Sequence, residues 1–239
     1  MNKYMKMLDP RRRRLTGRLK SMRERIRLLE DELSKHTSNH YRVSIFGSAR
    51  TRPDDDYYKM TYRLAYLLGE KGIDVLTGGG PGLMQAANSG VQDGRDASGS
   101  KSMSYGLSIE LGALGKLERP SQHLDIKHHH NRFSSRLDDF MRLSNAVVVT
   151  PGGIGTVLEL YFSWQLLQVQ HLPYRPIIML HEDFWSGLID WMKEVQLDQG
   201  LVSEEDFRFI KFAKTPEEAM SLLEDDHKQF MEEAGIPVK

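Results

Sequence analysis

Three glycine-rich turns, each directly after a predicted strand, are the parts of this sequence best suited to bind a phosphate group. They are Gly47-Ser48-Ala49-Arg50, the segment 78–84 and the segment 151–156. A glycine at the end of a strand lets the backbone approach a ligand, and a following helix offers unpaired N–H groups and the positive end of its dipole to an anion. One such turn alone fits an ordinary strand–helix connection. Three in one sheet favour a phosphate site.

Neither of the common glycine patterns for nucleotides is present. From Gly78, the last position of the dinucleotide pattern G-x-G-x-x-G falls on Leu83. The spacing of a P-loop occurs from Gly94 to Gly99, but Ser100 intervenes before Lys101 and no strand precedes it. We therefore expect a phosphate site of another type.

The segments that must position these turns alternate strand and helix patterns from residue 41 onward. This order predicts an α/β fold with a doubly wound, Rossmann-like parallel sheet and helices on both faces, which binds ligands at the carboxyl ends of its strands. The predicted strands are 41–46, 73–76, 105–111, 146–150, 176–180 and 207–213. The predicted helices are 55–71, 83–92, 132–143, about 155–169, 184–198 and a last one from 215.

The first 36 residues differ from the rest in charge. They hold 12 Lys and Arg against 5 Asp and Glu, a net charge of +7 in a chain whose total is zero. Their apolar residues recur every three or four positions, which predicts a helix that packs on another helix and favours a homo-oligomer. A nucleic-acid arm is the alternative, but no aromatic residue lies among the arginines to stack on bases. We expect an arm at 1–40 and one nucleotide-binding domain at 41–239. The regularly spaced apolar residues of this arm form the predicted seam of the helix: Leu15, Leu19, Met22, Ile26, Leu29 and Leu33.

Composition excludes several classes of protein. There is no cysteine, which rules out disulfides, thiolate nucleophiles and Cys-ligated metals, and 39% of the residues are hydrophobic, as in a globular protein. No apolar run approaches the roughly 20 residues that cross a bilayer, and the basic start lacks the apolar segment of a secretory signal. We therefore expect a cytoplasmic protein without a membrane partner.

The second and third turns together carry a family resemblance. The third runs Pro151-Gly152-Gly153-Ile154-Gly155-Thr156 and reaches Glu159 three residues later, and with the segment 78–84 it resembles the Lonely Guy (LOG) family. Members of this family are nucleoside 5′-monophosphate phosphoribohydrolases, long described as lysine decarboxylases. The resemblance covers residues 43–223 and includes Arg136, fifteen residues before Pro151. The turn after the first strand and the segment 184–188 are most similar to the larger bacterial subgroup.

The resemblance implies a chemistry that the residue types can perform. Cleavage of an N-glycosidic bond builds positive charge on the ribose. Glu159 could stabilise that charge and activate water, and Arg136 could hold the phosphate or ribose or assist the leaving base. The alternatives are a solvated helix glutamate and a structural ion pair. The other expected substrate- and phosphate-binding residues are Gly47, Ser48, Gly79, Gly80, Gly82, Met84, Glu118, Gly152, Gly153, Ile154, Gly155, Thr156 and Gln165.

Four positions depart from the family pattern. Leu137 stands where relatives usually have Lys, Leu158 where they usually have an acid, Gln165 where a Thr helps to bind substrate, and Ser108 where the larger subgroup has Asn. Two functions therefore remain open. The chain either hydrolyses AMP, another nucleotide or a cytokinin riboside monophosphate, or binds a nucleotide as a sensor without turnover.

Other candidate sites are weaker. The run His128-His129-His130 has no partner at metal-ligand spacing, so we interpret it as a solvated loop or a wall of the pocket. The acids at 54–56 are interpreted as the start of a helix. No lysine is nominated for a pyridoxal phosphate Schiff base, and we expect neither a metal nor a cofactor.

Overall fold

The computed structural model describes residues 14–26, 40–109 and 121–235. The chain divides into two units, Met1–Asn39 and His40–Lys239. In the first unit, residues 14–26 form a helix. Its apolar positions Leu15, Leu19, Met22 and Ile26 are each more than half exposed. The last two positions of the predicted seam, 29 and 33, lie outside the described residues.

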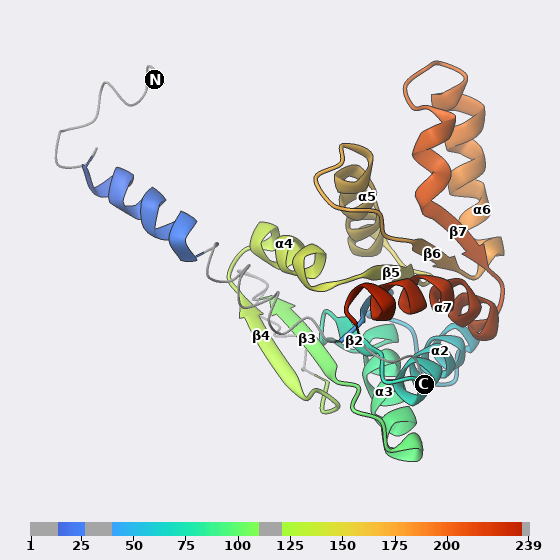
Figure 1. Ribbon diagram of the computed structural model, residues 1–239. Coiled ribbons are helices and arrows are strands. Elements are labelled where there is room, and N and C mark those ends of the chain that lie inside the picture. The colour runs from blue at the N-terminus through green and yellow to red at the C-terminus, as the bar shows by residue number, and fades with distance from the viewer. Residues whose placement is uncertain (1–13, 27–39, 110–120, 236–239) are drawn as a thin grey trace. The chain divides into compact units, whose positions relative to one another are not determined.

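The second unit is built on a sheet of seven strands that are all parallel, as the sequence predicts (Figure 1). The strand order is β4-β3-β2-β1-β5-β6-β7, so the chain winds outward from β1 in one direction and then, from β5, in the other. The order reverses between β1 and β5, which is where doubly wound sheets bind their ligands. The strands are β1 Arg42–Phe46, β2 Asp74–Thr77, β3 Ser104–Ile109, β4 Ile126–His130, β5 Ala146–Val149, β6 Ile177–Leu180 and β7 Ile210–Ala213.

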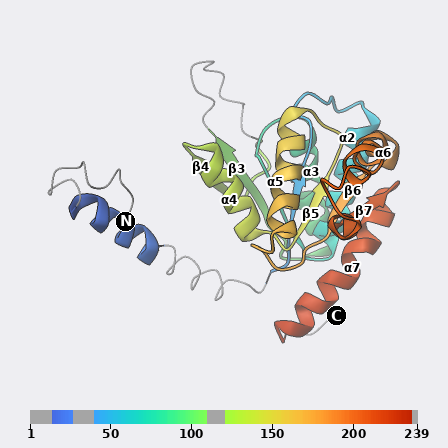
Figure 2. The same cartoon turned by 90° about the horizontal axis from the view of Figure 1, so that it is seen from above.

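Helices cover both faces of the sheet, and each face has its own hydrophobic core (Figures 1 and 2). Successive strand residues point to opposite faces, so β1 places Val43 and Ile45 in one core and Phe46 in the other. The helices α2, α3 and α7 pack the first core, and α4, α5 and α6 pack the second. They are α2 Asp56–Glu70, α3 Leu83–Ser98, α4 Phe133–Leu143, α5 Ile154–Gln168, α6 Glu182–Trp191 and α7 Pro216–Glu233.

The helix starts follow from local side chains. The Asp55 carboxylate accepts a hydrogen bond from the Tyr57 N–H and caps α2, which agrees with the interpretation of the acids at 54–56. The Thr215 hydroxyl accepts from the Glu218 N–H and caps α7, with Pro216 at the first helical position. None of the helices in the described ranges is long and apolar enough to cross a membrane.

Several predicted boundaries are wrong. β4, which contains His128–His130, was not predicted, because its polar sequence shows neither an apolar run nor alternation. It is an edge strand, exposed along most of its length, so no core selects its residues. The predicted helix at 184–198 begins at Glu182 and ends in a π-helix, Met192–Leu197, and the first half of the predicted last strand is a 3₁₀-helix, Glu204–Phe209.

Candidate active site

The three glycine-rich turns lie side by side at the carboxyl ends of β1, β2 and β5. The Ser48 N–H donates to the Pro151 carbonyl oxygen at 3.2 Å, which ties the turn after β1 to the turn after β5. The Leu83 N–H donates to the Ser48 carbonyl oxygen at 2.9 Å, which ties it to the turn after β2. The turns therefore converge beside the point where the strand order reverses.

The glycines of these turns fall into two groups. Gly82 has a φ of +69°, and a Cβ at this position would lie 2.3 Å from the Ser48 carbonyl oxygen, so no other residue fits. A Cβ added to Gly153 or Gly155 would meet no atom within 4 Å. Gly82 thus holds two turns together, whereas Gly153 and Gly155 border open space.

This open space lies at the N-terminus of α5. The N-cap residue is Gly153, which has no side chain to cap the helix, and the first turn contains no acidic residue. The Thr156 side chain is buried and lies against Gly152, whereas Ile154 is 91% exposed. The first N–H groups of a helix have no partner within it. Those of α5 are therefore suited to an anion.

Arg136 on α4 and Glu159 on α5 form an ion pair beside these turns. Arg136 Nη2 lies 3.5 Å from Glu159 Oε1, and the two side chains are only 12% and 14% exposed. Arg136 Nε donates to the Leu107 carbonyl oxygen at 2.8 Å, and its guanidinium lies 5.3 Å from the ring centroid of Phe140. A carbonyl oxygen of β3 and an aromatic ring thus hold the arginine against the carboxylate.

The turn after β2 touches this pair. A Cβ at Gly78 would lie 2.3 Å from Arg136 Nη2 and 2.7 Å from Met84 Sδ, so the arginine and the methionine meet over this glycine. Met84 lies in the first turn of α3 and is 8% exposed. Gly79 and Gly80 are buried in the same turn. Gly78 is not among the site residues expected from the sequence, although it lies within the motif.

Other expected site residues lie apart or outside the described ranges. Gln165 is exposed, lies six residues beyond Glu159 on α5, and donates to Gln168 at 3.1 Å. On a helix, that spacing places it on another face from Glu159. Leu158, by contrast, precedes Glu159 and is 46% exposed. Glu118 lies outside the described residues. Leu137 is buried next to Arg136.

His128–His130 lie in strand β4, so they do not form a solvated loop, which was one of the two arrangements that we expected. His130 ends β4 with 9% of its side chain exposed, and its Nε2 has no hydrogen bond among the described residues. Asp139 Oδ2 lies 3.6 Å from that nitrogen, and burial lowers the pKa of the imidazole. His128 and His129 are exposed. Within the described part of the chain, no group of three or more potential ligands is arranged to hold a metal.

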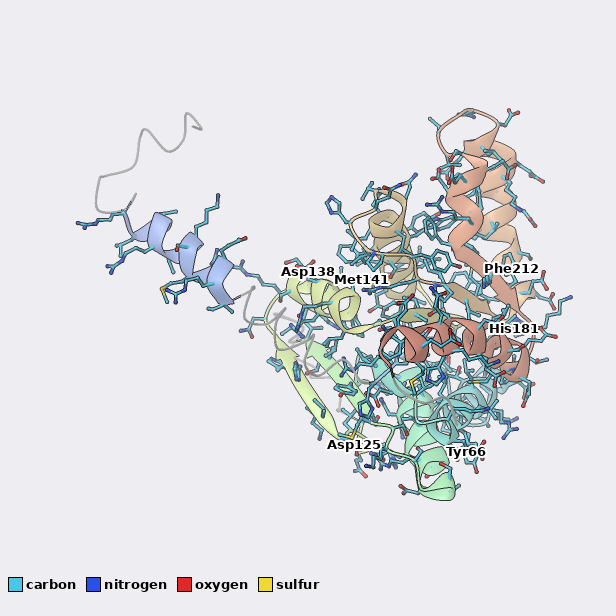
Figure 3. The ribbon with its side chains drawn as sticks, in the orientation of Figure 1. Tyr66, Asp125, Asp138, Met141, His181 and Phe212 are labelled. Carbon is cyan, nitrogen blue, oxygen red and sulfur yellow. The ribbon has the colours of Figure 1, made fainter. Side chains whose placement is uncertain are left out.

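His181 is a residue of this edge that sequence reasoning missed. His181, which is labelled in Figure 3, follows β6 and has a φ of +72°. Its ring packs edge-on against that of Tyr57, with ring centroids 4.8 Å apart. A left-handed conformation in a residue other than glycine is strained and concentrates near functional sites. The contact joins the starts of α2 and α6 on the far side of β5. No signal in the sequence marks a histidine in this conformation.

Comparison with known proteins identifies the family. Residues 84–223 match the family model described as "possible lysine decarboxylase". The rice protein named probable cytokinin riboside 5′-monophosphate phosphoribohydrolase LOGL3 is 30% identical over 177 residues, covering 70% of this chain and 78% of the relative. The phosphoribohydrolase LOG2 of Arabidopsis thaliana is 26% identical, covering 79% and 84%. The chain therefore belongs to the LOG family.

The fold is shared with solved structures of lower identity. The molybdenum cofactor binding protein of Rippkaea orientalis is 20% identical with a TM-score of 0.55, covering 78% of this chain and 96% of that one. At this identity the likeness concerns the fold alone. The same architecture therefore occurs in a protein that is named for binding a cofactor.

Proposed function

We propose that this protein hydrolyses the N-glycosidic bond of a nucleoside 5′-monophosphate to a free base and ribose 5-phosphate. The observation that carries the proposal is the buried Arg136–Glu159 pair, placed just over one helical turn after the open N-terminus of α5. The names of the curated relatives support the same reaction. An AMP-like nucleotide or a cytokinin riboside monophosphate is the substrate class that we propose.

The phosphate binds at the start of α5 in this proposal. The N–H groups of Gly153, Gly155 and Thr156 and the positive end of the helix dipole stabilise its charge. Because no side chain fills the space beside Gly153 and Gly155, the phosphate can approach the backbone. Glu159 follows Gly155 by four residues, about 6 Å along the helix axis, so a phosphate at the helix start brings the ribose next to the carboxylate.

Glu159 acts on the ribose and the attacking water. Its carboxylate stabilises the positive charge that develops as the C1′–N bond breaks, and it accepts a proton from the water that forms the new C1′–O bond. The electron pair of the broken bond leaves with the base, which takes up a proton. Arg136 orients the carboxylate through Nη2. It acts from a fixed position, because its Nε is bonded to the Leu107 carbonyl oxygen.

A nucleotide-binding protein without turnover is the second candidate. It is favoured by Leu158, half-exposed at the position where relatives carry an acid, and by the fold that the chain shares with a cofactor-binding protein. Such a protein would use the same phosphate site. The two candidates differ only in whether the bond is broken.

Incubation with a panel of nucleoside monophosphates, each beside its nucleoside, tests the proposal. Chromatography should detect free base from at least one monophosphate and none from the nucleosides. The melting temperature is measured with the same ligands. Stabilisation by monophosphates without release of base would favour the binding protein. If the monophosphates cause neither stabilisation nor release of base, both candidates are rejected.

A further inference from the structure

A phosphate at the start of α5 needs a cation that the Arg136–Glu159 pair does not supply. This inference rests on the proposed function. A nucleotide monophosphate carries up to two negative charges, and backbone N–H groups bring only partial charges to it. Arg136 is bonded to the Leu107 carbonyl oxygen and paired with Glu159. The phosphate therefore needs a guanidinium or ammonium group that is not already paired, on one of the turns at the carboxyl ends of the strands.

Arg50 lies on the turn that contacts the phosphate turn directly. Its N–H donates to Ser48 Oγ at 3.0 Å, and the Ser48 N–H donates to the Pro151 carbonyl oxygen at 3.2 Å. β1 and β5 are adjacent strands with paired residues from Val43↔Ala146 to Phe46↔Val149. Two hydrogen bonds therefore fix the backbone of Arg50 next to the turn after β5.

The Arg50 side chain is exposed and forms no ion pair or hydrogen bond with the described residues. Arg52, two residues further on, differs because its Nε lies 3.4 Å from Asp54 Oδ1. Both arginines belong to the same exposed loop, so the difference in pairing is not a difference in solvent exposure. Arg50 thus offers a planar guanidinium, the group best suited to bind a phosphate with two parallel hydrogen bonds.

Among the described residues, Arg132 is the rival cation. It is also exposed, forms no side-chain ion pair with the described residues, and is the N-cap residue of α4, directly after β4. β4 is the edge strand, four positions from β5 in the sheet order, whereas β1 is next to β5. The turn that carries Arg50 is also hydrogen-bonded to the turn after β5, and this contact favours Arg50.

We propose that Arg50 binds the 5′-phosphate of the substrate opposite the N-terminus of α5 and so makes the site specific for monophosphates over nucleosides. Glu159 and Arg136 then serve the ribose and the bond that is cleaved, and Arg50 serves the phosphate. The site is divided between a turn that binds charge and a pair that performs chemistry.

Calorimetric titration with ribose 5-phosphate, with ribose as the reference ligand, tests this assignment. Ribose 5-phosphate is not hydrolysed further, so its binding is measured apart from turnover. We expect Arg50→Gln to weaken its binding about 10- to 100-fold, the effect of losing a charged hydrogen-bonding partner. Arg50→Lys should restore part of the loss. The exposed, paired control Arg52→Gln should bind like the wild type.

Three outcomes overturn the assignment: wild-type affinity in Arg50→Gln, the large loss in Arg132→Gln instead, or no binding of ribose 5-phosphate by the wild type. The proposed function is judged separately by release of base. A protein that hydrolyses a monophosphate while Arg50→Gln retains wild-type affinity would keep the function and lose the role of Arg50. Binding that depends on Arg50 without release of base would keep the role of Arg50 and reject the proposed hydrolysis.

Discussion

The amino ends of the strands (the amino edge) and their carboxyl ends (the carboxyl edge) both carry largely buried charged groups, but the two edges use these groups differently. At the amino edge, Asp74 begins β2, is 1% exposed, and accepts from the Met103 N–H at 2.9 Å. Arg42 Nε lies 3.4 Å from its other carboxylate oxygen, and His40 Nδ1 lies at the same distance from the first. Burial raises the pKa of Asp74, and these partners compensate in part.

A second network at the amino edge fastens α7. The Tyr41 hydroxyl, just before β1, donates to Asp226 on α7, and burial raises the pKa of both groups. Arg175, just before β6, donates to the Met141 carbonyl oxygen, and burial lowers its pKa to about 10. Figure 3 shows Met141 on α4. Polar groups of residues next to the strands and of both helical layers thus satisfy one another.

The carboxyl edge instead keeps donors open. The start of α5 has no capping side chain, and Arg50 is unpaired among the described residues. The Arg136–Glu159 pair, at 3.5 Å, is about as long as the Arg42–Asp74 pair at 3.4 Å, so the difference between the two edges lies in the open donors. In our proposal, charges that are paired on every side stabilise the structure, whereas charges left open beside the largely buried Arg136–Glu159 pair bind the ligand.

Loss of the Glu159 carboxylate, the group that we propose to be catalytic, is expected to have the largest effect. Glu159→Gln keeps the size of the side chain and an oxygen for Arg136, but it removes the charge and the base. We expect base release to fall by about 10²- to 10⁴-fold, as for the loss of one acid–base group, while ribose 5-phosphate still binds. Glu217→Gln, which removes an exposed partner of Arg63, is the control. Near-wild-type turnover in Glu159→Gln would remove Glu159 from the chemistry.

The two groups of glycines should separate folding from binding. Gly82→Ala places a methyl group 2.3 Å from the Ser48 carbonyl oxygen at a φ of +69°, so we expect the free energy of unfolding to fall by about 1–3 kcal/mol. Gly155→Ala meets no atom within 4 Å and should leave that free energy unchanged while weakening ribose 5-phosphate binding. Denaturant unfolding and calorimetry measure the two effects. Equal losses of stability would contradict the division.

Substitutions at the amino edge should lower the free energy of unfolding and leave the activity unchanged. Tyr41→Phe removes the hydroxyl that bonds to Asp226, and we expect the free energy of unfolding to fall by about 1–3 kcal/mol with kcat unchanged. Tyr58→Phe is the control, because its half-buried hydroxyl has no hydrogen bond with the described residues. A fall in kcat without loss of stability in Tyr41→Phe would mean that this edge takes part in function.

A smaller effect should follow from acidification. Burial lowers the pKa of His227 on α7, whose ring lies 5.1 Å from that of Tyr41. The unfolded chain, with an ordinary histidine pKa of about 6.5, then binds the proton more readily than the folded protein. Stability is therefore fully present above about pH 6.5 and is lost as the pH falls below it. Melting temperatures from pH 8 to pH 5 should decline less in His227→Gln than in the wild type. An identical decline would exclude His227, and His128→Gln, on exposed β4, is the control.

The N-terminal arm should have the smallest effect on turnover. Deletion of residues 1–39 removes the exposed row Leu15, Leu19, Met22 and Ile26. We propose that this row joins copies of the chain, so the deletion should lower the number of chains per particle, measured by light scattering, and leave kcat unchanged. An unchanged number of chains per particle would show that the arm does not mediate assembly.

The sequence predicts the fold, and it predicts which glycine-rich turns meet at the carboxyl ends of the strands, because both follow from patterns that repeat along the chain. An apolar strand such as β5 followed by a glycine turn and a helix requires a parallel sheet covered on both faces, and it places Glu159 at the carboxyl edge. The contact of Gly78 with Arg136 was not predictable, since it depends on the path of α4 across the sheet. β4 was missed because an exposed polar edge has no hydrophobic period.

Product analysis with the best substrate of the panel tests the central claim most directly. Chromatography should find free base and ribose 5-phosphate in equal amounts, with no nucleoside and no inorganic phosphate. Those two products together mean that the C1′–N bond was cleaved. Nucleoside with inorganic phosphate would mean cleavage at the phosphate instead, and tight binding without any product would mean that the site no longer performs the reaction of its relatives. Either result would contradict the account.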